Sequence, residues 1–435
     1  MTWSGVGEEI RCAPCPAELQ PDQRLRRGRS MLIISLLLIL FSLLLIWQFV
    51  GYPLLMLAIY KRSEPEQKDY SFQPSVSVVV PTFNEAGNIV ARLDNLAGLD
   101  YPKEKYEVIV VDSGSTDGTA NLVENYRDTC PVEHGCNISI IREGSRKGKA
   151  SAINLGRQHA RAEIVLVTDA NDLFDREVLK EMMPHFKNPG VGAVGGRYVV
   201  SNQDNRLASS TQFYWRLEYI MRCGEAILDS ACTFHGEINA WRKQLISANP
   251  EAVTEDLDMC VRLHKSGYKI QYEPRAVVYE PAPTTSADQI KQRKRTALGT
   301  IQCLFNYPGY LAVPRNWYTL LIFPSHKILP MISPFVLIMI FLFYLYLIPH
   351  HYLIILYHFI FSLLAFILLY LLLIRLTASR GQGGTSNGLA MGGVFKTVEY
   401  VLLNEYLVLL AWKDFLTGRV SVLWDKVEST RNEAC

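Results

Sequence analysis

Polar and acidic side chains gather at three points in this chain, each directly after a short apolar run. The three segments are Pro81-Thr82-Phe83-Asn84-Glu85, Asp112-Ser113-Gly114-Ser115-Thr116-Asp117-Gly118 and Thr168-Asp169-Ala170-Asn171-Asp172. In the third, Asp169 and Asn171 offer the oxygen ligands that Mg²⁺ or Mn²⁺ prefers. A bound metal would neutralise a diphosphate and stabilise it as a leaving group. The pattern therefore predicts a metal-dependent site for a phosphorylated substrate.

Basic residues that could hold such phosphates occur between the second and third segments. Arg146, Lys147 and Lys149 lie in the stretch REGSRKGKASAINLG, whose glycines let the backbone approach a phosphate group. Seen alone, these charges fit a solvated turn equally well. Because they lie between acidic segments, we interpret Lys147 and Lys149 as donor-binding residues.

A further acidic cluster, Thr254-Glu255-Asp256-Leu257-Asp258, opens a helix predicted over residues 257–264. A carboxylate at a helix start can serve only as an N-cap. It can also act as a general base, because direct transfer of a group to a hydroxyl requires a side chain that accepts the hydroxyl proton. We take Asp256 as this base, and Glu255 and Asp258 as helix-start charges.

Strands and helices in alternation must position these residues. Three runs are apolar throughout, as is typical of strands buried on both faces of a parallel sheet, and they cover residues 76–80, 108–111 and 164–167. Helices are predicted over 85–96 and 116–126, with Asn84 and Ser115 as N-caps. Ligands of such sheets bind at the carboxyl ends of the strands, where the polar segments begin. The alternative is that these segments are ordinary caps and turns.

The composition limits the class of partner. The chain has 435 residues with 44 Lys and Arg against 42 Asp and Glu, so it presents no basic field for nucleic acid. Nine cysteines without paired spacing are typical of a reducing compartment. Cys12 and Cys15 lack the two further ligands of a zinc site, and we interpret this terminus as an unstructured tail.

Apolar residues concentrate at the two ends of the chain. Residues 32–59 contain no charge and exceed both the roughly 20 residues that span a bilayer and the core of a signal peptide. Residues 331–348 and 352–374 are predicted as a transmembrane hairpin, after a chain break at Pro324 and Pro330. The stretch 394–412 carries three charged residues and either spans the bilayer or lies at its interface.

Basic residues beside these helices predict which side the middle of the chain faces. Lys61, Arg62, Arg375 and Arg380 place it in the cytoplasm. Arginines at positions 24, 26, 27 and 29 favour the opposite orientation of the first helix.

The motifs, in this order, resemble those of the inverting family 2 glycosyltransferases, in particular the membrane branch with the cellulose, hyaluronan, chitin and poly-N-acetylglucosamine synthases. PTFNE resembles the first-strand motif, which implies that Thr82 and Glu85 contact the nucleotide. VVDSGSTDGT resembles the second, which implies that Asp112 holds the nucleobase, although Ser113 stands where an Asp is usual. TDAND is similar to the D-x-D metal motif, with Asn171 in place of the second Asp.

The resemblance extends to the acceptor side. VTEDLD is similar to the T-E-D motif, which implies that Asp256 is the general base, with Glu255 beside the acceptor. Gln292-Arg293-Lys294-Arg295-Thr296 resembles Q-x-x-R-W, which implies that Gln292 and Arg295 approach the acceptor and the diphosphate. Thr296 stands where this motif has the Trp on which a growing polysaccharide stacks. Two further matches are Gly236, in the acceptor-contacting loop FHGEINA, and Trp424, in a segment that covers the nucleotide.

The resemblance implies an α/β, GT-A-like nucleotide-sugar-binding domain inserted between N-terminal and C-terminal transmembrane helices. The expected layout is a tail (1–30), a transmembrane helix (31–60), a linker (61–74), the catalytic domain (75–284), amphipathic interface helices (285–330), a transmembrane hairpin (331–376), and a third apolar helix with the C-terminal tail (377–435).

We therefore expect an inverting glycosyltransferase that uses a UDP-sugar and Mg²⁺ or Mn²⁺ on the cytoplasmic face of a cell membrane, in contact with membrane lipid and without nucleic acid. The acceptor is either a growing polysaccharide, which would make the protein a processive synthase, or a lipid-linked acceptor that receives one sugar. An alternative of another class is a non-catalytic scaffold subunit, which the presence of Asp169 and Asp256 disfavours.

Overall fold

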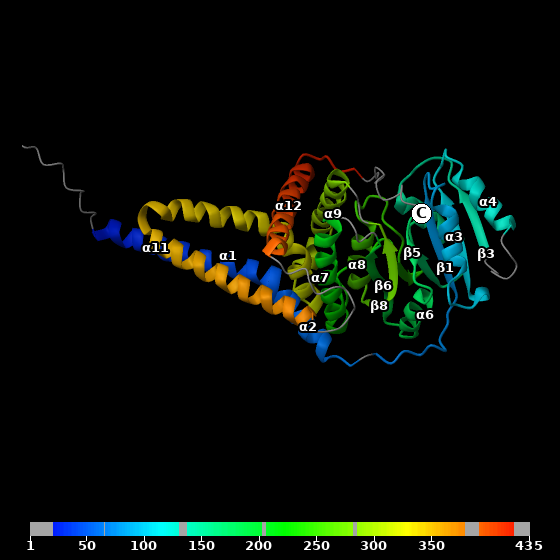
Figure 1. Ribbon diagram of the computed structural model, residues 1–435, viewed down its shortest axis with the longest axis horizontal. Coiled ribbons are helices and arrows are strands. Elements are labelled where there is room, and N and C mark those ends of the chain that lie inside the picture. Colours follow the sequence, from blue (N-terminus) through cyan, green and yellow to red (C-terminus); the bar gives the residue numbers. More distant parts are fainter. Residues whose placement is uncertain are drawn as a thin grey trace, which may run out of the picture.

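The protein consists of an α/β domain and a long helical arm (Figure 1). The computed structural model describes residues 21–64, 66–129, 137–201, 206–281, 285–378 and 391–421. The α/β domain lies at one end, the arm extends to the other, and α7, α9 and α12 lie between them (Figure 1).

The domain is built on one eight-stranded sheet with the order β3-β2-β1-β4-β7-β6-β8-β5. The strands are β1 (Val76–Thr82), β2 (Tyr106–Asp112), β3 (Asn137–Arg142), β4 (Ile164–Val167), β5 (Leu173–Phe174), β6 (Val191–Val200), β7 (Asn239–Arg242) and β8 (Lys269–Glu280). Strands β1 to β4 are parallel, as the sequence predicts. The other half is mixed, because β7 is antiparallel to β4 and β6, whereas β6 and β8 are parallel.

Helices cover both faces of the sheet. One face packs on α3 (Ile89–Ala97), α4 (Thr119–Thr129) and α6 (Val178–Met182). The other packs on α5 (Lys149–His159), α7 (Arg206–Leu228) and α8 (Glu255–Lys265). Short 3₁₀ turns occur at η2 (Lys103–Lys105) and η4 (Met183–Lys187). The apolar runs of the sequence follow from this layering, since Val78 and Val80 face one helical layer and Val79 the other.

Two helices begin later than the sequence predicts. Helix α3 starts at Ile89 and α4 at Thr119, not at 85 and 116. The predicted caps bind each other's loops instead: the Ser115 hydroxyl accepts from the Asn84 amide at 2.8 Å, and the Asn84 side chain accepts from the Thr116 amide at 2.8 Å. Asn84 adopts a positive φ of 55°, which carries the chain away from helical geometry at this point.

The arm is built from the two ends of the chain. Helix α1 (Pro21–Ile46), the π turn η1 (Trp47–Gly51) and α2 (Tyr52–Arg62) form one continuous segment. Against it packs α11 (Leu329–Ala378), which doubles back on itself (Figure 1). The Tyr344 hydroxyl lies 2.8 Å from His358 Nδ1, although a straight helix would separate residues 14 apart by about 21 Å.

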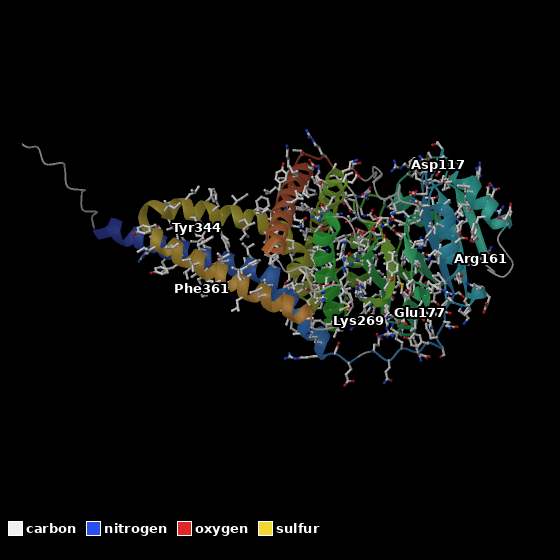
Figure 2. All side chains as sticks on the ribbon, in the orientation of Figure 1. Asp117, Arg161, Glu177, Lys269, Tyr344 and Phe361 are labelled. Atoms are coloured by element: carbon white, nitrogen blue, oxygen red, sulfur yellow. The ribbon has the colours of Figure 1, made fainter. Side chains whose placement is uncertain are left out.

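Side chains along the arm, such as the labelled Phe361, end mostly in carbon, whereas the α/β domain carries many nitrogen and oxygen ends (Figure 2). Two of the described helical segments are long and apolar enough to cross a membrane, Arg29–Arg62 and Tyr318–Ile348. The predicted chain break at Pro324 and Pro330 is wrong. The π turns η5 (Tyr318–Ile322) and η6 (Pro324–Ile328) lead directly into α11, and Pro324 opens a turn, where its missing N–H is tolerated.

Three helices connect the arm to the domain: α9 (Ser286–Asn306), α10 (Pro308–Leu311) and α12 (Met391–Leu416). Helix α12 packs along α9, where Lys294 lies 2.5 Å from Asp414. The Trp412 indole donates to the Met331 carbonyl at 2.9 Å at the start of α11. The third apolar helix is thereby fixed to both neighbours.

A buried polar junction fixes the arm on α7. Glu225 is fully buried, accepts from the Tyr52 hydroxyl at 2.6 Å and lies 2.6 Å from His326. Next to it, a Cβ on Gly224 would come within 2.5 Å of the Met56 carbonyl, so only glycine permits this approach of α2 to α7. The arm and the domain are thus held in direct contact.

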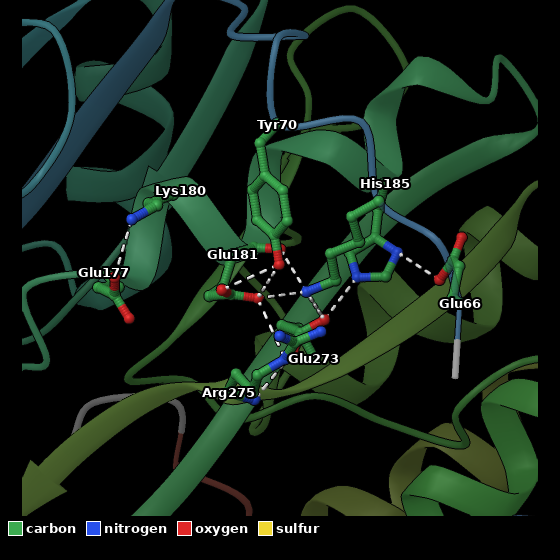
Figure 3. A network of polar contacts seen from close by, with 9 residues as sticks. Glu66, Tyr70, Glu177, Lys180, Glu181, His185, Glu273 and Arg275 are labelled. Atoms are coloured by element: carbon green, nitrogen blue, oxygen red, sulfur yellow. Dashed lines mark hydrogen bonds and ion pairs between the residues drawn. The ribbon is translucent and has the colours of Figure 1, made fainter. Parts of the chain in front are cut away.

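The linker after α2 is clamped to the edge of the domain (Figure 3). Lys68 is inserted between Glu181, at 2.6 Å, and Glu273, and all three side chains are buried. His185 lies 2.8 Å from Glu273 and 3.2 Å from Glu66 of the linker. Burial alone would lower the pKa of His185, but these carboxylates outweigh it and raise that pKa.

Candidate active site

The residues predicted to contact a nucleotide meet where β1 and β2 end. Thr82 and Asp112 are register partners in this parallel pair. The Thr82 hydroxyl donates to the Val111 carbonyl at 3.2 Å, and Asp112 accepts from both the amide and the hydroxyl of Ser115. Glu85 is buried beside them and accepts from Asn88 Nδ2 at 3.0 Å. These contacts shape one wall of the site.

Lys149 joins three of the predicted motifs. Its ammonium lies 2.6 Å from Asp169 at the end of β4 and 3.8 Å from Glu255 at the start of α8. It also donates to the Gly236 carbonyl at 3.4 Å. Burial would lower the pKa of Lys149, but Asp169, Glu255 and Glu237 outweigh it and raise that pKa. The Lys149 ammonium therefore lies where these three motifs meet, whereas Lys147 is exposed on the preceding loop.

Asp256 lies in the first turn of α8, next to Glu255. Burial and the neighbouring Glu255 raise its pKa, with Lys149 acting in the opposite direction. The helix N-terminus that carries it is packed tightly against α9, since a Cβ on Gly299 would lie 2.3 Å from the Thr254 hydroxyl. The start of α8 therefore lies close against α9, and the raised pKa of Asp256 makes it more basic than an ordinary aspartate.

Arg295 connects α9 to the same region. Its Nε and Nη2 donate to the Val253 carbonyl at 3.0 and 2.8 Å. Burial lowers the pKa of Arg295, while Glu255 and Asp256 raise it, so the guanidinium lies within electrostatic reach of both acids. On the same helix Gln292 is half-buried and Thr296 is exposed, with its hydroxyl donating to the Gln292 carbonyl at 3.1 Å. Trp424 lies outside the described residues.

The predicted metal ligands lie at the end of β4. In the described ranges, no group of three or more His, Cys, Asp or Glu side chains is arranged to hold a metal. Asp169 and Asn171 are both partly exposed, and their oxygens fit a hard cation that completes its coordination with substrate phosphates and water. A metal bound to Asp169 would compete with Lys149 for the carboxylate.

Two acids that sequence reasoning did not single out, Glu237 and Glu280, are influenced electrostatically by Asp169. Burial raises the pKa of Glu280 and that of Glu237, the latter to about 7, and nearby carboxylates add to both shifts. Asp172 is fully buried, and neither carboxylate oxygen has a hydrogen-bond partner in the described part of the chain. The one sequence signal for Glu237 is its place next to Gly236 in FHGEINA.

An aromatic cluster borders the Gly236 loop and was also missed. The Trp215 ring on α7 lies 4.6 Å from the Tyr198 ring and 4.9 Å from the His235 ring, between centroids. The sequence gives no signal for it, because Trp215 and His235 are brought together only by the packing of α7 on β6.

Two glycosyltransferase family models match this chain. The model of glycosyl transferase family 2 matches residues 77–247, and that of glycosyl transferase family group 2 matches residues 164–377. The chain is 28% identical over 230 residues to a poly-β-1,6-N-acetyl-D-glucosamine synthase of Staphylococcus aureus, 52% of this chain and 54% of that protein. It is 26% identical over 246 residues, 55% of this chain, to the Staphylococcus epidermidis protein of the same name, of which 58% is covered. The chain spans about half the length of the curated relatives it matches.

A solved structure matches over more of the chain. A mannosyltransferase from Pyrobaculum calidifontis, in complex with GDP-Man and Mn²⁺, is similar with a TM-score of 0.63 and 25% sequence identity. The match covers 89% of this chain and 100% of that one.

The sheet with its acidic strand ends defines a GT-A-like glycosyltransferase fold, as the sequence predicts. The two family models together span residues 77–377, and the chain belongs to the family 2 glycosyltransferases, related to a polysaccharide synthase.

Proposed function

We propose that this protein transfers a sugar from a UDP-sugar to an acceptor hydroxyl with inversion, on the cytoplasmic face of a membrane. One observation carries the proposal: Lys149 contacts both Asp169 of the D-x-D-like motif and Glu255, the neighbour of Asp256. Residues for the leaving diphosphate and for the incoming hydroxyl thus converge on one point.

Asp256 acts as the general base. Its raised pKa makes it a stronger acceptor for a hydroxyl proton. As the acceptor oxygen attacks the anomeric carbon, Asp256 takes its proton. The bond from that carbon to the diphosphate oxygen breaks on the opposite face, so the configuration inverts.

The donor is held by the residues of the strand ends. Thr82, Glu85 and Asp112 contact the nucleotide, and Lys147, Lys149 and Arg295 supply cationic donors to the diphosphate. Asp169 and Asn171 would hold Mg²⁺ or Mn²⁺, and the bound cation would supply positive charge to the leaving diphosphate.

The membrane location rests on the apolar arm. Two helical segments have the length and hydropathy of membrane-crossing helices, Arg29–Arg62 and Tyr318–Ile348. The C-terminal half of α11 runs back alongside them (Figure 1). Lys61 and Arg62 end the first helix on the side of the α/β domain, which favours a cytoplasmic domain. We propose the expected layout with two changes: helix α1 begins at Pro21, inside the expected tail, and the apolar helix Tyr318–Ile348 begins inside the expected interface segment.

Two acceptors fit the chemistry, and a different observation favours each. The curated relatives are polysaccharide synthases by name, which favours a growing polysaccharide that contacts Gly236, Gln292 and Glu255. The second candidate, a lipid-linked acceptor that receives one sugar, is favoured by Thr296 in place of the stacking Trp. The small number of long apolar helices in the described part of the chain also favours it, because they offer little material for a polymer channel.

Sizing the product separates these candidates. The full-length protein in nanodiscs is incubated with Mn²⁺ and each of a panel of radiolabelled UDP-sugars, together with GDP-mannose. High-molecular-weight label is expected from a polysaccharide synthase, and a small lipid-extractable product from a single transfer. Absence of labelled product with every donor, in the presence of membrane lipid extract, would contradict the proposal of sugar transfer.

A further inference from the structure

The helices of the arm change from exposed to buried where they meet the α/β domain. Along the first segment, most large apolar side chains are exposed as far as Leu43, whereas Val50 and Tyr52 are buried. Along α11, exposed apolar side chains begin at Ile332, just after the buried Leu329. In the proposed membrane location the exposed stretches lie in the hydrocarbon. The residues at this change therefore lie at the level of the lipid headgroups.

Lys327 lies at this level without a partner. It is half-buried in the π turn η6, and within the described residues no carboxylate, hydroxyl or carbonyl pairs with its ammonium. A charged amine in an apolar helical segment is costly, so such a residue usually faces a polar partner or a ligand. The turn also contacts the first segment, because the Trp47 indole donates to the Ser325 hydroxyl at 3.0 Å. Lys327 thus lies where both apolar segments reach the domain.

A second cation at this junction also lacks acceptors. Arg222 of α7 is 4% exposed, and its Nη2 lies 3.0 Å from Glu218 Oε2. Its Nε and Nη1 are buried, and neither has a hydrogen-bond partner in the part of the chain that the structure describes. Buried donors without acceptors are costly, so these N–H groups indicate an acceptor that the chain does not supply.

The surrounding cluster has an excess of positive charge. His326 lies 3.1 Å from Glu218 and 2.6 Å from Glu225, through its two ring nitrogens. Ionised carboxylates only accept hydrogen bonds, so both nitrogens carry hydrogen and the imidazole is charged. Burial would raise the pKa of Glu218, but His326, Arg222 and Lys327 outweigh it and hold that pKa well below its usual value. Three basic side chains thus face two carboxylates, and an anion would balance them.

We propose that Lys327 and Arg222 bind the phosphate group of an anionic membrane lipid at the junction of the arm and the domain. This inference rests on the membrane location in the proposed function. Phosphate oxygens accept several charge-assisted hydrogen bonds, which matches an unpaired ammonium and unpaired guanidinium N–H groups. The position favours a lipid over a soluble anion, because basic pockets at the ends of membrane helices hold lipid headgroups.

Calorimetry on the full-length protein in a neutral detergent tests this site. The ligand is dioctanoyl phosphatidic acid, and dioctanoylglycerol is the matched lipid without phosphate. Inorganic phosphate, titrated separately, distinguishes a lipid from a free anion. The variants are Lys327→Met, which keeps the aliphatic length, Lys327→Arg, which keeps the charge, and Arg222→Gln. The control is Lys413→Met, which removes an exposed cation from the last turn of α12.

We expect the wild type to bind dioctanoyl phosphatidic acid and not dioctanoylglycerol. Lys327→Met and Arg222→Gln should each weaken binding by about 10- to 100-fold, the range for hydrogen bonds to a charged group. Lys327→Arg should retain most of the affinity, and Lys413→Met should bind like the wild type. An unchanged Kd in Lys327→Met, or an equal loss in Lys413→Met, would overturn the inference. Equally tight binding of inorganic phosphate would overturn the assignment to a lipid.

Failure of this inference can be told apart from failure of the proposed function. Flotation with phosphatidylcholine liposomes tests the membrane location of the wild type without an anionic lipid. Protein that floats but does not bind dioctanoyl phosphatidic acid would refute the lipid site alone. Labelled product from the wild type tests sugar transfer, whatever binds at Lys327.

Discussion

Replacing Lys68 by Met should destabilise the α/β domain much more than an ordinary surface ion pair would suggest. The Lys68 ammonium lies 2.6 Å from Glu181 and also contacts Glu273, and the exposed fraction of the three side chains is 4%, 7% and 3% (Figure 3). Methionine keeps the aliphatic length and removes the charge. Two buried carboxylates then lose the buried cation that they share.

The magnitude follows from what each carboxylate retains. Removal of one partner of a buried ion pair costs roughly 3 to 5 kcal/mol. Glu273 keeps His185 at 2.8 Å, Glu181 keeps the Tyr70 hydroxyl at 3.2 Å, and the exposed Arg275 lies 3.3 Å from Glu181 and 3.8 Å from Glu273. We therefore expect the lower end, about 3 kcal/mol, which lowers the Tm of a domain of this size by roughly 6 to 12 °C.

Thermal unfolding of the full-length protein in nanodiscs, followed by tryptophan fluorescence, measures the effect. The matched control is Lys187→Met, because Lys187 also lies 2.6 Å from a carboxylate, Asp69, but is 60% exposed. Such a pair contributes about 0.2 to 1 kcal/mol. Equal shifts in Tm for the two variants would refute the reasoning, since distance and not burial would then set the cost.

Four further outcomes are expected. Asp256→Asn should lower the rate of transfer by about 10²- to 10⁴-fold with little change in the Kd of UDP-sugar, and retained turnover would remove Asp256 as the base. Asp169→Ala should abolish the Mn²⁺-dependent part of donor binding by calorimetry, and unchanged affinity would locate the metal elsewhere. Arg295→Ala should slow transfer while the Tm falls only slightly, whereas wild-type rates would confine Arg295 to a structural role. The free energy of unfolding should be highest between pH 4.5 and 6.5. The pKa of Glu273 is lowered by folding, so its contribution to stability is lost as the pH falls below the usual pKa of 4.5. The pKa of His185 is raised by folding, so its contribution is complete below the usual pKa of 6.5 and is lost as the pH rises through the raised pKa. In His185→Phe the loss of Tm on the alkaline side should disappear.

The parallel half of the sheet could be predicted because local sequence determines it. Strands buried on both faces need apolar side chains at every position, and 76–80, 108–111 and 164–167 satisfy this condition without help from distant residues. The helix starts could not be predicted in the same way. Asn84 and Ser115 have the chemistry of N-caps, but each finds its partner in the other's loop.

In the site, too, some features follow from local sequence and others only from contacts between distant residues. From the sequence we predicted Asp169, Glu255 and Asp256 as acids of a transferase site, and the family comparison agrees with that class of enzyme. It did not show that Lys149, which we interpreted as a phosphate ligand beside glycines, pairs with Asp169 and Glu255. That contact joins residues from three separate elements, and no spacing along the chain encodes it.

The sequence by itself therefore determined the family, the order of the motifs and the apolar ends, since each depends on residue types within a short window. The tertiary structure alone decided the mixed half of the sheet, the clamp on Lys68 and the contact of Lys149 with Asp169 and Glu255. These depend on which distant groups share a buried volume, where an uncompensated charge is costly and each carboxylate must find a partner or a ligand.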